Sequence, residues 1–224
     1  MTEPHERNTD FSAPVHIATE AMAWRPSPGG NVWRKRLELA GSVEAGRVTA
    51  LVKFAAGSTF PAHGHPDGEE ILVLGGTFAD EHGDYPAGTF LLNPEGFAHA
   101  PFSREGCTLF VKLRQYPGRD KRHLAIDTTT AEWRETGPGR RVLALWADTQ
   151  GPESIRLVRL APGTRVDRHE HPGGEEVFIL EGDLADEAGR YGRGDWLRLP
   201  HGSGHAPSTD RGCLLYVKVG HLPA

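Results

Sequence analysis

The sequence has little cysteine, no long hydrophobic run and no excess of positive charge. Two cysteines in 224 residues are too few for a disulfide framework. No stretch approaches the roughly 18 consecutive apolar residues of a membrane-spanning helix, so we expect no membrane insertion. The net charge of −5 disfavours nucleic acid as a partner, because proteins that hold phosphate backbones usually carry a basic excess. The polar, acidic N-terminus lacks the layout of a secretory signal, so we expect a cytoplasmic protein.

Glycine, proline and histidine are abundant instead. The 28 glycines and 17 prolines argue against a helical bundle and favour many short strands joined by turns. Apolar runs such as residues 71–74 and 177–180 are short and continuous, as is typical of buried strands. We therefore predict an all-β fold of small antiparallel barrels or sandwiches. The 12 histidines are the unusual feature, and their placement guides the functional interpretation.

An internal repeat organises most of the chain. Residues 57–112 align with residues 163–218 at a constant offset of 106 without a gap, and about 26 of the 56 aligned residues are identical. The period is too long for a solenoid repeat and is the size of a small domain, which indicates a tandem duplication. We predict a flexible tail over residues 1–18, a first domain over 19–118, a linker over 119–130 and a second domain over 131–224.

Each half carries three histidines and one glutamate at matched positions. They are His63, His65, Glu69 and His99 in the first half, and His169, His171, Glu175 and His205 in the second. A His-x-His pair on a strand places both imidazoles on one face, because side chains alternate with a period of two. A turn containing glycine can then bring the glutamate back, and the third histidine comes from a distant strand. We predict these eight residues as metal ligands.

Three neutral imidazoles and one carboxylate suit a divalent transition metal better than magnesium or calcium, which prefer oxygen ligands. The predicted cofactor is one ion per domain of Fe, Zn, Mn, Ni or Cu, with Fe or Zn favoured. In a six-coordinate ion, four protein ligands leave two positions for water, dioxygen or a chelating substrate. A lone histidine is usually just solvated, but here the whole pattern occurs twice inside an independently visible repeat.

The same spacings resemble the two motifs of the cupin superfamily. The first motif, G-x5-H-x-H-x3-E-x6-G, is met by residues 57–76 and again by residues 163–182. The second motif, G-x5-P-x-G-x2-H, is met by residues 88–99 and 194–205. The flanking sequence HPDGEEILVLGGTFADEHGDYP and its twin are similar to the ChrR-like group of cupins. This resemblance implies two tandem jelly-roll β-barrels, each with a metal inside.

The ChrR-like group implies two different functions. It includes nonheme iron dioxygenases that cleave carbon–carbon bonds beside ketones, so we expect a metal-dependent dioxygenase or related enzyme acting on a small carbonyl-containing compound. It also includes the sensor half of zinc-dependent anti-sigma factors, and the alternative is a non-catalytic zinc-binding sensor. Such anti-sigma factors carry an N-terminal helical domain with its own zinc site. Since few residues and no cysteine precede the first predicted barrel, we expect that sigma-binding domain to be absent.

The expected partner is a small-molecule ligand or substrate, with a homodimer left open because cupin barrels often pair. No catalytic residue is identified, although Glu70 or Glu176 beside the predicted ligands could serve as a base or be an outer carboxylate. The second motif differs between the copies. The residues Phe90, Leu92, Asn93 and Phe97 become Trp196, Arg198, Leu199 and Ser203. If these side chains line the pockets, the two pockets differ in shape.

Three further groups of residues are given structural roles. Cys107 and Cys213 share one repeat position and are expected to be small buried residues that open a strand, not a disulfide. Lys112 and Lys218 are expected to be solvated or ion-paired. The histidines outside the pattern are expected to be ordinary surface residues, and His201 is not counted as a ligand. Those without a repeat partner are His5, His16, His82, His123 and His221.

Overall fold

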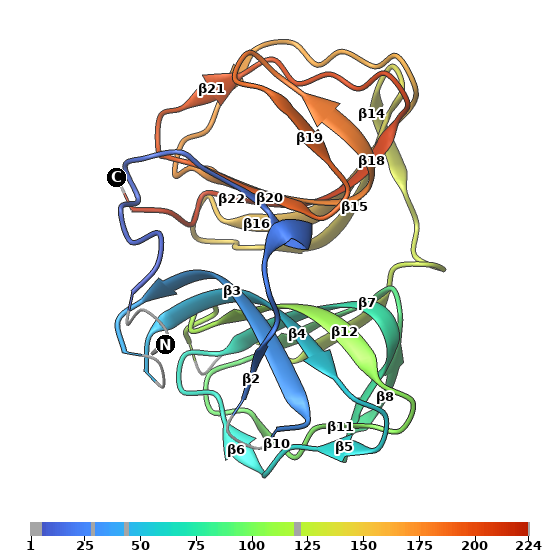
Figure 1. Cartoon of the computed structure of the whole chain (residues 1–224). Coiled ribbons are helices and arrows are strands. Elements are labelled where there is room, and N and C mark those ends of the chain that lie inside the picture. Colours follow the sequence, from blue (N-terminus) through green and yellow to red (C-terminus); the bar gives the residue numbers. More distant parts are fainter. Residues whose placement is uncertain (1–5, 28–29, 43–44, 119–121, 224) are drawn as a thin grey trace. The chain divides into compact units, whose positions relative to one another are not determined.

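The computed structural model describes residues 6–27, 30–42, 45–118 and 122–223, which form two compact units (Figure 1). The first unit, here called the first barrel, joins the residues up to Thr9 with Ala23–Ala131. The second barrel joins Asp10–Met22 with the residues from Glu132 onward. Apart from one short 3-10 helix, η1 (Thr19–Ala21), the regular elements of the described residues are β-strands.

The first barrel is built on an antiparallel sheet of order β13-β9-β7-β12-β4-β3-β2. Strands β5, β8 and β11 attach to this path, and β6 and β10 form a separate two-stranded ladder. The strands are β2 (Arg25–Pro26), β3 (Val32–Ala40), β4 (Arg47–Phe54), β5 (Ser58–Thr59), β6 (His63–Gly64), β7 (Glu69–Asp80), β8 (Gly83–Pro86), β9 (Thr89–Asn93), β10 (Ala98–His99), β11 (Phe102–Ser103), β12 (Cys107–Leu113) and β13 (Leu124–Asp127).

The second barrel repeats this plan, with an antiparallel sheet of order β1-β20-β18-β22-β16-β15-β14. Strand β19 pairs with β18, and β17 and β21 form the separate ladder. The strands are β1 (Val15–Ala18), β14 (Arg134–Gly137), β15 (Arg140–Ala147), β16 (Ser154–Leu160), β17 (His169–Glu170), β18 (Glu175–Ala185), β19 (Arg190–Gly192), β20 (Asp195–Leu199), β21 (Gly204–His205) and β22 (Cys213–Val219).

Each barrel has its own apolar core, as expected for two independent domains. In the first barrel Val48, Ala50, Val52 and Phe54 belong to one buried cluster, because every second side chain of β4 points inward. In the second barrel the corresponding cluster includes Val158 and Leu160 of β16. Apolar burial of this kind is the main force that holds an antiparallel barrel together. The prediction of an all-β fold in two domains is confirmed.

The longest strand of each barrel bends where it passes from one part of the sheet to another. In β7 the first half pairs with β9 and β12, whereas the second half pairs with β8 and β11. A bulge interrupts the β7–β12 register at Thr108/Leu109, and Gly76 beside it adopts a φ of 71°. The second barrel has the same bulge in β18, with Gly182 at a φ of 77°. A bulge with a left-handed glycine lets one strand serve two faces of the barrel.

Two short strands lie in the segments predicted as tail and linker. Within the predicted tail, β1 pairs with β20 along four residues from Val15↔Arg198 to Ala18↔Asp195, so this part of the tail is an edge strand of the second barrel. Within the predicted linker, β13 pairs with β9 of the first barrel. Four-residue strands carry too little alternation to be recognised in the sequence, and their pairing partners are far away in the chain. Residues 1–5 and 119–121 lie outside the described residues.

No helix among the described residues is long and apolar enough to cross a membrane.

Candidate functional site

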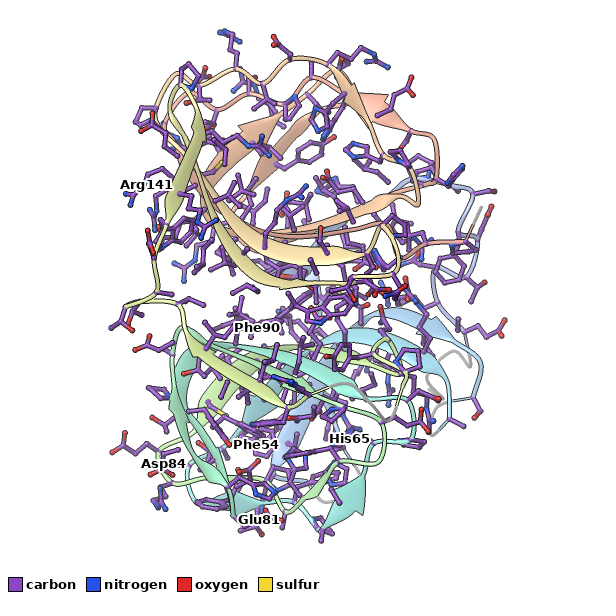
Figure 2. The ribbon with its side chains drawn as sticks, turned by 180° about the vertical axis from the view of Figure 1, so that it is seen from behind. Phe54, His65, Glu81, Asp84, Phe90 and Arg141 are labelled. Atoms are coloured by element: carbon purple, nitrogen blue, oxygen red, sulfur yellow. The ribbon has the colours of Figure 1, made fainter. Side chains whose placement is uncertain are left out.

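Three histidines converge inside the first barrel. His63 and His99 face each other across the β6–β10 ladder, and His65 follows β6 directly. The ring centroids are 4.9 Å apart for His63 and His65, 5.1 Å for His63 and His99, and 4.9 Å for His65 and His99. One ring nitrogen from each histidine lies within 4.8 Å of the other two. Figure 2 shows His65 directed into the interior of this barrel.

The second barrel holds an equivalent triad. His169 and His205 face each other across the β17–β21 ladder, and His171 follows β17. The ring centroids are separated by 4.9 Å, 5.1 Å and 4.9 Å, in the same order as in the first barrel. Again one nitrogen from each ring lies within 4.8 Å of the others. The repeated sequence pattern therefore builds the same local geometry twice.

The two predicted glutamate ligands lie beside the triads. Glu69 opens β7, and its Oε2 atom is 3.3 Å from His65 Nε2 and 3.6 Å from His99 Nε2. Glu175 opens β18, with its carboxylate oxygens 3.6 Å from His171 Nδ1 and 3.5 Å from His205 Nε2. All eight predicted ligands thus gather in two groups of four. Their ligand roles stay predictions.

Hydrogen bonds at the rear of the rings orient four of the six imidazoles. His63 Nδ1 lies 2.8 Å from the carbonyl oxygen of Pro61, and His169 Nδ1 lies 3.0 Å from that of Asp167. In the third histidine of each triad, Nδ1 lies 3.0 Å from a carboxylate. Each such contact holds the proton on Nδ1 and leaves Nε2 as the lone-pair donor. Carbonyl and carboxylate partners of this kind are typical of metal-binding histidines, so the donor set fits a divalent transition ion.

The carboxylates in question belong to Asp80 and Asp186, which sequence reasoning missed. Their oxygens lie 3.0 Å from His99 Nδ1 and from His205 Nδ1. Asp80 Oδ1 also accepts the backbone N–H of His82 at 2.8 Å, so this aspartate shapes the turn that it begins as well as holding His99. The available signal was the repeat, because the two aspartates are identical at the offset of 106.

Burial and nearby charges set the protonation of the first triad. Burial lowers the pKa of His65 to about 3, so this ring is neutral and can donate a lone pair to a metal. Burial opposes protonation of His99, yet the carboxylates of Asp80 and Glu69 outweigh it and raise its pKa. Burial raises the pKa of Glu69 to about 7, although His99 and Asn93 act in the opposite direction. Metal binding here must therefore displace protons near neutrality.

The glutamate of the second triad has a different environment. Burial would raise the pKa of Glu175, but the hydrogen bond from His205 and the charges of His171, His205 and Arg156 outweigh it and lower this pKa. Arg156 has no counterpart at the matching position of the first barrel, where Ala50 stands. The carboxylate in the second barrel is consequently ionised over a wider pH range than that in the first.

Each group of four predicted ligands opens into a cavity within its own barrel. In the first barrel a cavity of about 320 Å³ reaches His63 and Glu69 and has mostly aliphatic and aromatic walls. In the second a cavity of about 550 Å³ reaches His169, Glu175 and His205. Both volumes lie in the range of small-molecule sites. A small ligand can therefore approach each triad.

The chain matches the sequence family of the ChrR cupin-like domain twice, over residues 12–117 and over residues 121–223. The chain belongs to the ChrR cupin-like family. Its expected resemblance to two tandem cupin barrels is thereby confirmed, and the two matches together cover almost all of the chain.

Among curated proteins, this cupin is similar to the anti-sigma-E factor ChrR of Cereibacter sphaeroides. The two are 35% identical over 80 residues, which is 36% of this chain and 37% of that protein. The match thus spans little more than a third of the length of the relative.

Solved structures of bicupins, which are proteins with two tandem cupin barrels, share the fold of this chain at low sequence identity. A candidate dioxygenase from Nostoc punctiforme has a TM-score of 0.76 and 17% identity, covering 93% of this chain and 82% of that one. Protein Ylba from E. coli has a TM-score of 0.71 and 16% identity, covering 96% and 94%. Oxalate decarboxylase from Bacillus subtilis has a TM-score of 0.66 and 15% identity, covering 93% and 78%. These similarities establish the fold of the cupin chain.

The buried cysteines and lysines of this cupin occupy strands. Cys107 and Cys213 open β12 and β22, are buried and are free thiols, as predicted. Lys112 and Lys218 are fully buried, so neither is solvated. Lys218 Nζ forms an ion pair with Glu153 at 3.0 Å, and Lys112 Nζ donates a hydrogen bond to the hydroxyl of Thr49 at 2.9 Å.

Glu70 and Glu176 do not face the predicted metal sites. Both are buried, and neither lines the two cavities at the triads, because each follows a predicted ligand along a strand and points to the opposite face. Glu176 instead accepts hydrogen bonds from Trp196 Nε1 at 3.2 Å and from His221 at 2.8 Å. The positions of these carboxylates give no support to a role as catalytic base.

One histidine outside the pattern was assigned wrongly. The side chain of His221 is only 3% exposed, and its Nε2 atom lies 2.8 Å from the buried carboxylate of Glu176. His16, His82 and His123 are at least partly exposed, as expected. His5 lies outside the described residues.

Removing the charge behind the third histidine is expected to weaken metal binding in one barrel. Asp80→Asn keeps the turn acceptor for His82 but removes the carboxylate that orients His99, so we expect roughly 10- to 100-fold lower metal affinity at the first site. Metal titration of the purified protein measures the change. Asp84→Asn is the control, because Asp84 is exposed and paired with Arg104 at 2.8 Å. Equal affinity in Asp80→Asn and wild type would show that the aspartate does not support the metal.

Proposed function

We propose that this cupin is a metal-dependent enzyme, a dioxygenase of the nonheme iron type or a related enzyme, acting on a small carbonyl-containing compound. The observation that carries the proposal is the position of each triad, which lies at the wall of a cavity large enough for a small molecule. A purely structural metal site is closed by its protein ligands, whereas a catalytic site keeps open positions beside a substrate pocket.

The residues of the first barrel provide what such chemistry requires. When bound, a divalent ion would act as a Lewis acid toward carbonyl oxygens, and iron would also supply electrons. Asp80 holds the proton on the rear nitrogen of His99, so that the front nitrogen stays available. Aliphatic side chains such as Val52, Ile71 and Leu109 line the cavity and limit access of water to the triad.

Similarity to enzymes supports this reading without transferring an activity. The solved bicupins with the same fold include one described as a dioxygenase and one as an oxalate decarboxylase, both at 17% identity or less. A non-catalytic zinc sensor is the second candidate, and the 35% identity to the anti-sigma-E factor ChrR over 80 residues favours it. Zinc does not change oxidation state, so a sensor would hold it without turnover.

Metal content and oxygen uptake separate the two candidates. We expect untagged protein to contain iron and to consume dioxygen when a β-diketone or a hydroxyketone is added. The same protein reconstituted with zinc should consume none, which serves as the control. Stoichiometric zinc in the isolated protein, together with no turnover by the iron-loaded form across the substrate panel, would contradict the enzyme and support the sensor.

A further inference from the structure

The cavity of the second barrel contains an arginine close to its metal ligands. Arg156, Val158 and Leu160 all line the cavity, because they alternate along the inward face of β16. His169, Glu175 and His205 line the same cavity. In the first barrel the matching position is Ala50, which is buried in the apolar core.

The guanidinium of Arg156 makes no hydrogen bond or ion pair with the described residues, although the charge of Glu175 acts on it. No ion pair involves it, and its Nε atom is buried without a hydrogen bond. Burial lowers the pKa of Arg156, and the neighbouring charge of Arg140 acts in the same direction, whereas Glu175 opposes both. The side chain of Arg156 is half-buried, and a guanidinium nitrogen withdrawn from water without a hydrogen-bond partner is costly, so a carboxylate ligand that reached it would be stabilised there.

The same strand pair holds an arginine in both barrels, but on opposite strands. In the second barrel Arg156 of β16 lies opposite Ala144 of β15. In the first barrel Arg36 of β3 lies opposite Ala50 of β4 and lines the first cavity. This strand pair thus carries an arginine in both barrels, although the strand that supplies the arginine differs. That recurrence indicates a use for the charge inside the cavity.

Cationic side chains outnumber anionic ones around the second cavity. Its lining contains two carboxylates, of Asp167 and Glu175. The arginines that line it are Arg140, Arg156, Arg165 and Arg168. Arg168 is already paired with Glu187 at 2.9 Å. Arg156 combines a half-buried side chain, a buried Nε atom without a hydrogen bond and a position in the cavity that Glu175 also lines, which makes it the group best placed to meet an anion.

We propose that the second cavity binds the carboxylate of a small anionic ligand through Arg156, with the rest of the ligand directed toward the triad of His169, His171 and His205. This inference rests on the proposed function and narrows its substrate class to carbonyl compounds that also carry a carboxylate, such as 2-oxocarboxylates. Arginine suits this role because its planar guanidinium donates two parallel hydrogen bonds to a carboxylate.

The test compares carboxylates with their neutral amides in zinc-loaded, full-length protein. The probes are pyruvate, 2-oxobutanoate and malonate, each titrated calorimetrically beside its amide. We expect at least one carboxylate to bind roughly tenfold or more tightly than its amide, and Arg156→Gln to remove that preference, as is typical of a hydrogen bond to a charged group. Arg156→Lys should retain part of it. Arg159→Gln is the matched control, because Arg159 is exposed on the same strand and paired with Glu181 at 3.5 Å.

Three results would overturn the proposal. One is a wild-type protein that binds no carboxylate of the panel more tightly than its amide. Another is an Arg156→Gln variant that keeps the preference. The third is loss of zinc from Arg156→Gln, because Arg156 would then act on Glu175 rather than on a ligand. Binding to zinc-loaded protein does not require turnover, so failure here leaves the oxygen-uptake experiment intact, and the reverse also holds.

Discussion

His63→Ala is expected to empty the first metal site and leave the second loaded, which lowers bound metal from two ions per chain to one. His169→Ala should do the reverse. The physical reason is that each triad is complete within one barrel, and the cavity that it faces is lined by residues of that barrel alone. Loss of one imidazole should weaken the affinity by more than the 10- to 100-fold that is typical when only an outer hydrogen-bond partner is lost. Elemental analysis of dialysed protein measures the stoichiometry.

His16→Ala is the matched control for removal of a histidine. Its Nε2 atom lies 2.9 Å from Asp195 Oδ2, and the ring lies outside both triads, so two ions should remain bound. The emptied barrel should also unfold at a lower temperature, since a ligand at about 1,000 times its dissociation constant stabilises the folded state by about 4 kcal/mol. If either single variant lost both ions, the two sites would not be independent.

The convergence of the predicted ligands could be foreseen from the sequence because their geometry is mostly local. His-x-His followed by a turn and a glutamate specifies its own spacing within a few residues, and strand alternation does the rest. His99 and His205 come from distant segments, and only the exact repetition of the second motif linked them to the other ligands. A single copy would not have shown that the distant histidine belongs with the other ligands. The second copy showed this, because all four residues recur at the same spacing.

The features that escaped prediction depend on contacts between distant segments. The pairing of β1 with β20 joins residues about 180 positions apart, from Val15↔Arg198 to Ala18↔Asp195. No local sequence pattern predicts such a pairing. His221 looked like a surface residue because its partner, Glu176, is 45 residues away. Composition and periodicity carry no information on such pairs.

Only part of the difference between the two sites lies at the second motif. Asn93, which is Leu199 in the second copy, donates a hydrogen bond to Glu69 at 2.9 Å. Leu92 and Arg198 differ between the copies, but neither lines the cavity at its triad. A further difference lies on an earlier strand pair, where Ala50 and Arg156 occupy the matching position and each barrel takes its arginine from a different strand. Which face of a strand points inward cannot be read from a continuous apolar run, because such a run lacks the alternation that marks the two faces.

Gly182→Ala is expected to destabilise the second barrel by about 3 kcal/mol or more. Gly182 adopts a φ of 77° at the bend of β18, a conformation that alanine adopts at a cost. A Cβ atom there would also collide with the carbonyl oxygen of Gly212 and with the Cα of Cys213 at 2.9 Å. Both are backbone atoms of the paired segment, so no side-chain rotation can relieve the contact, and β18 would have to separate from β22.

The loss should reach the metal site as well, because β18 begins with Glu175 at the second triad. Denaturant unfolding of the full chain measures the stability, and metal analysis measures occupancy of the second site. Gly192→Ala is the control in the same barrel, since Gly192 does not have a positive φ and a Cβ there would meet nothing within 4 Å. It should change stability by less than about 1 kcal/mol. A Gly182→Ala variant as stable as this control would show that the bend of β18 tolerates a side chain, and the role assigned to the glycine at the bulge would be wrong.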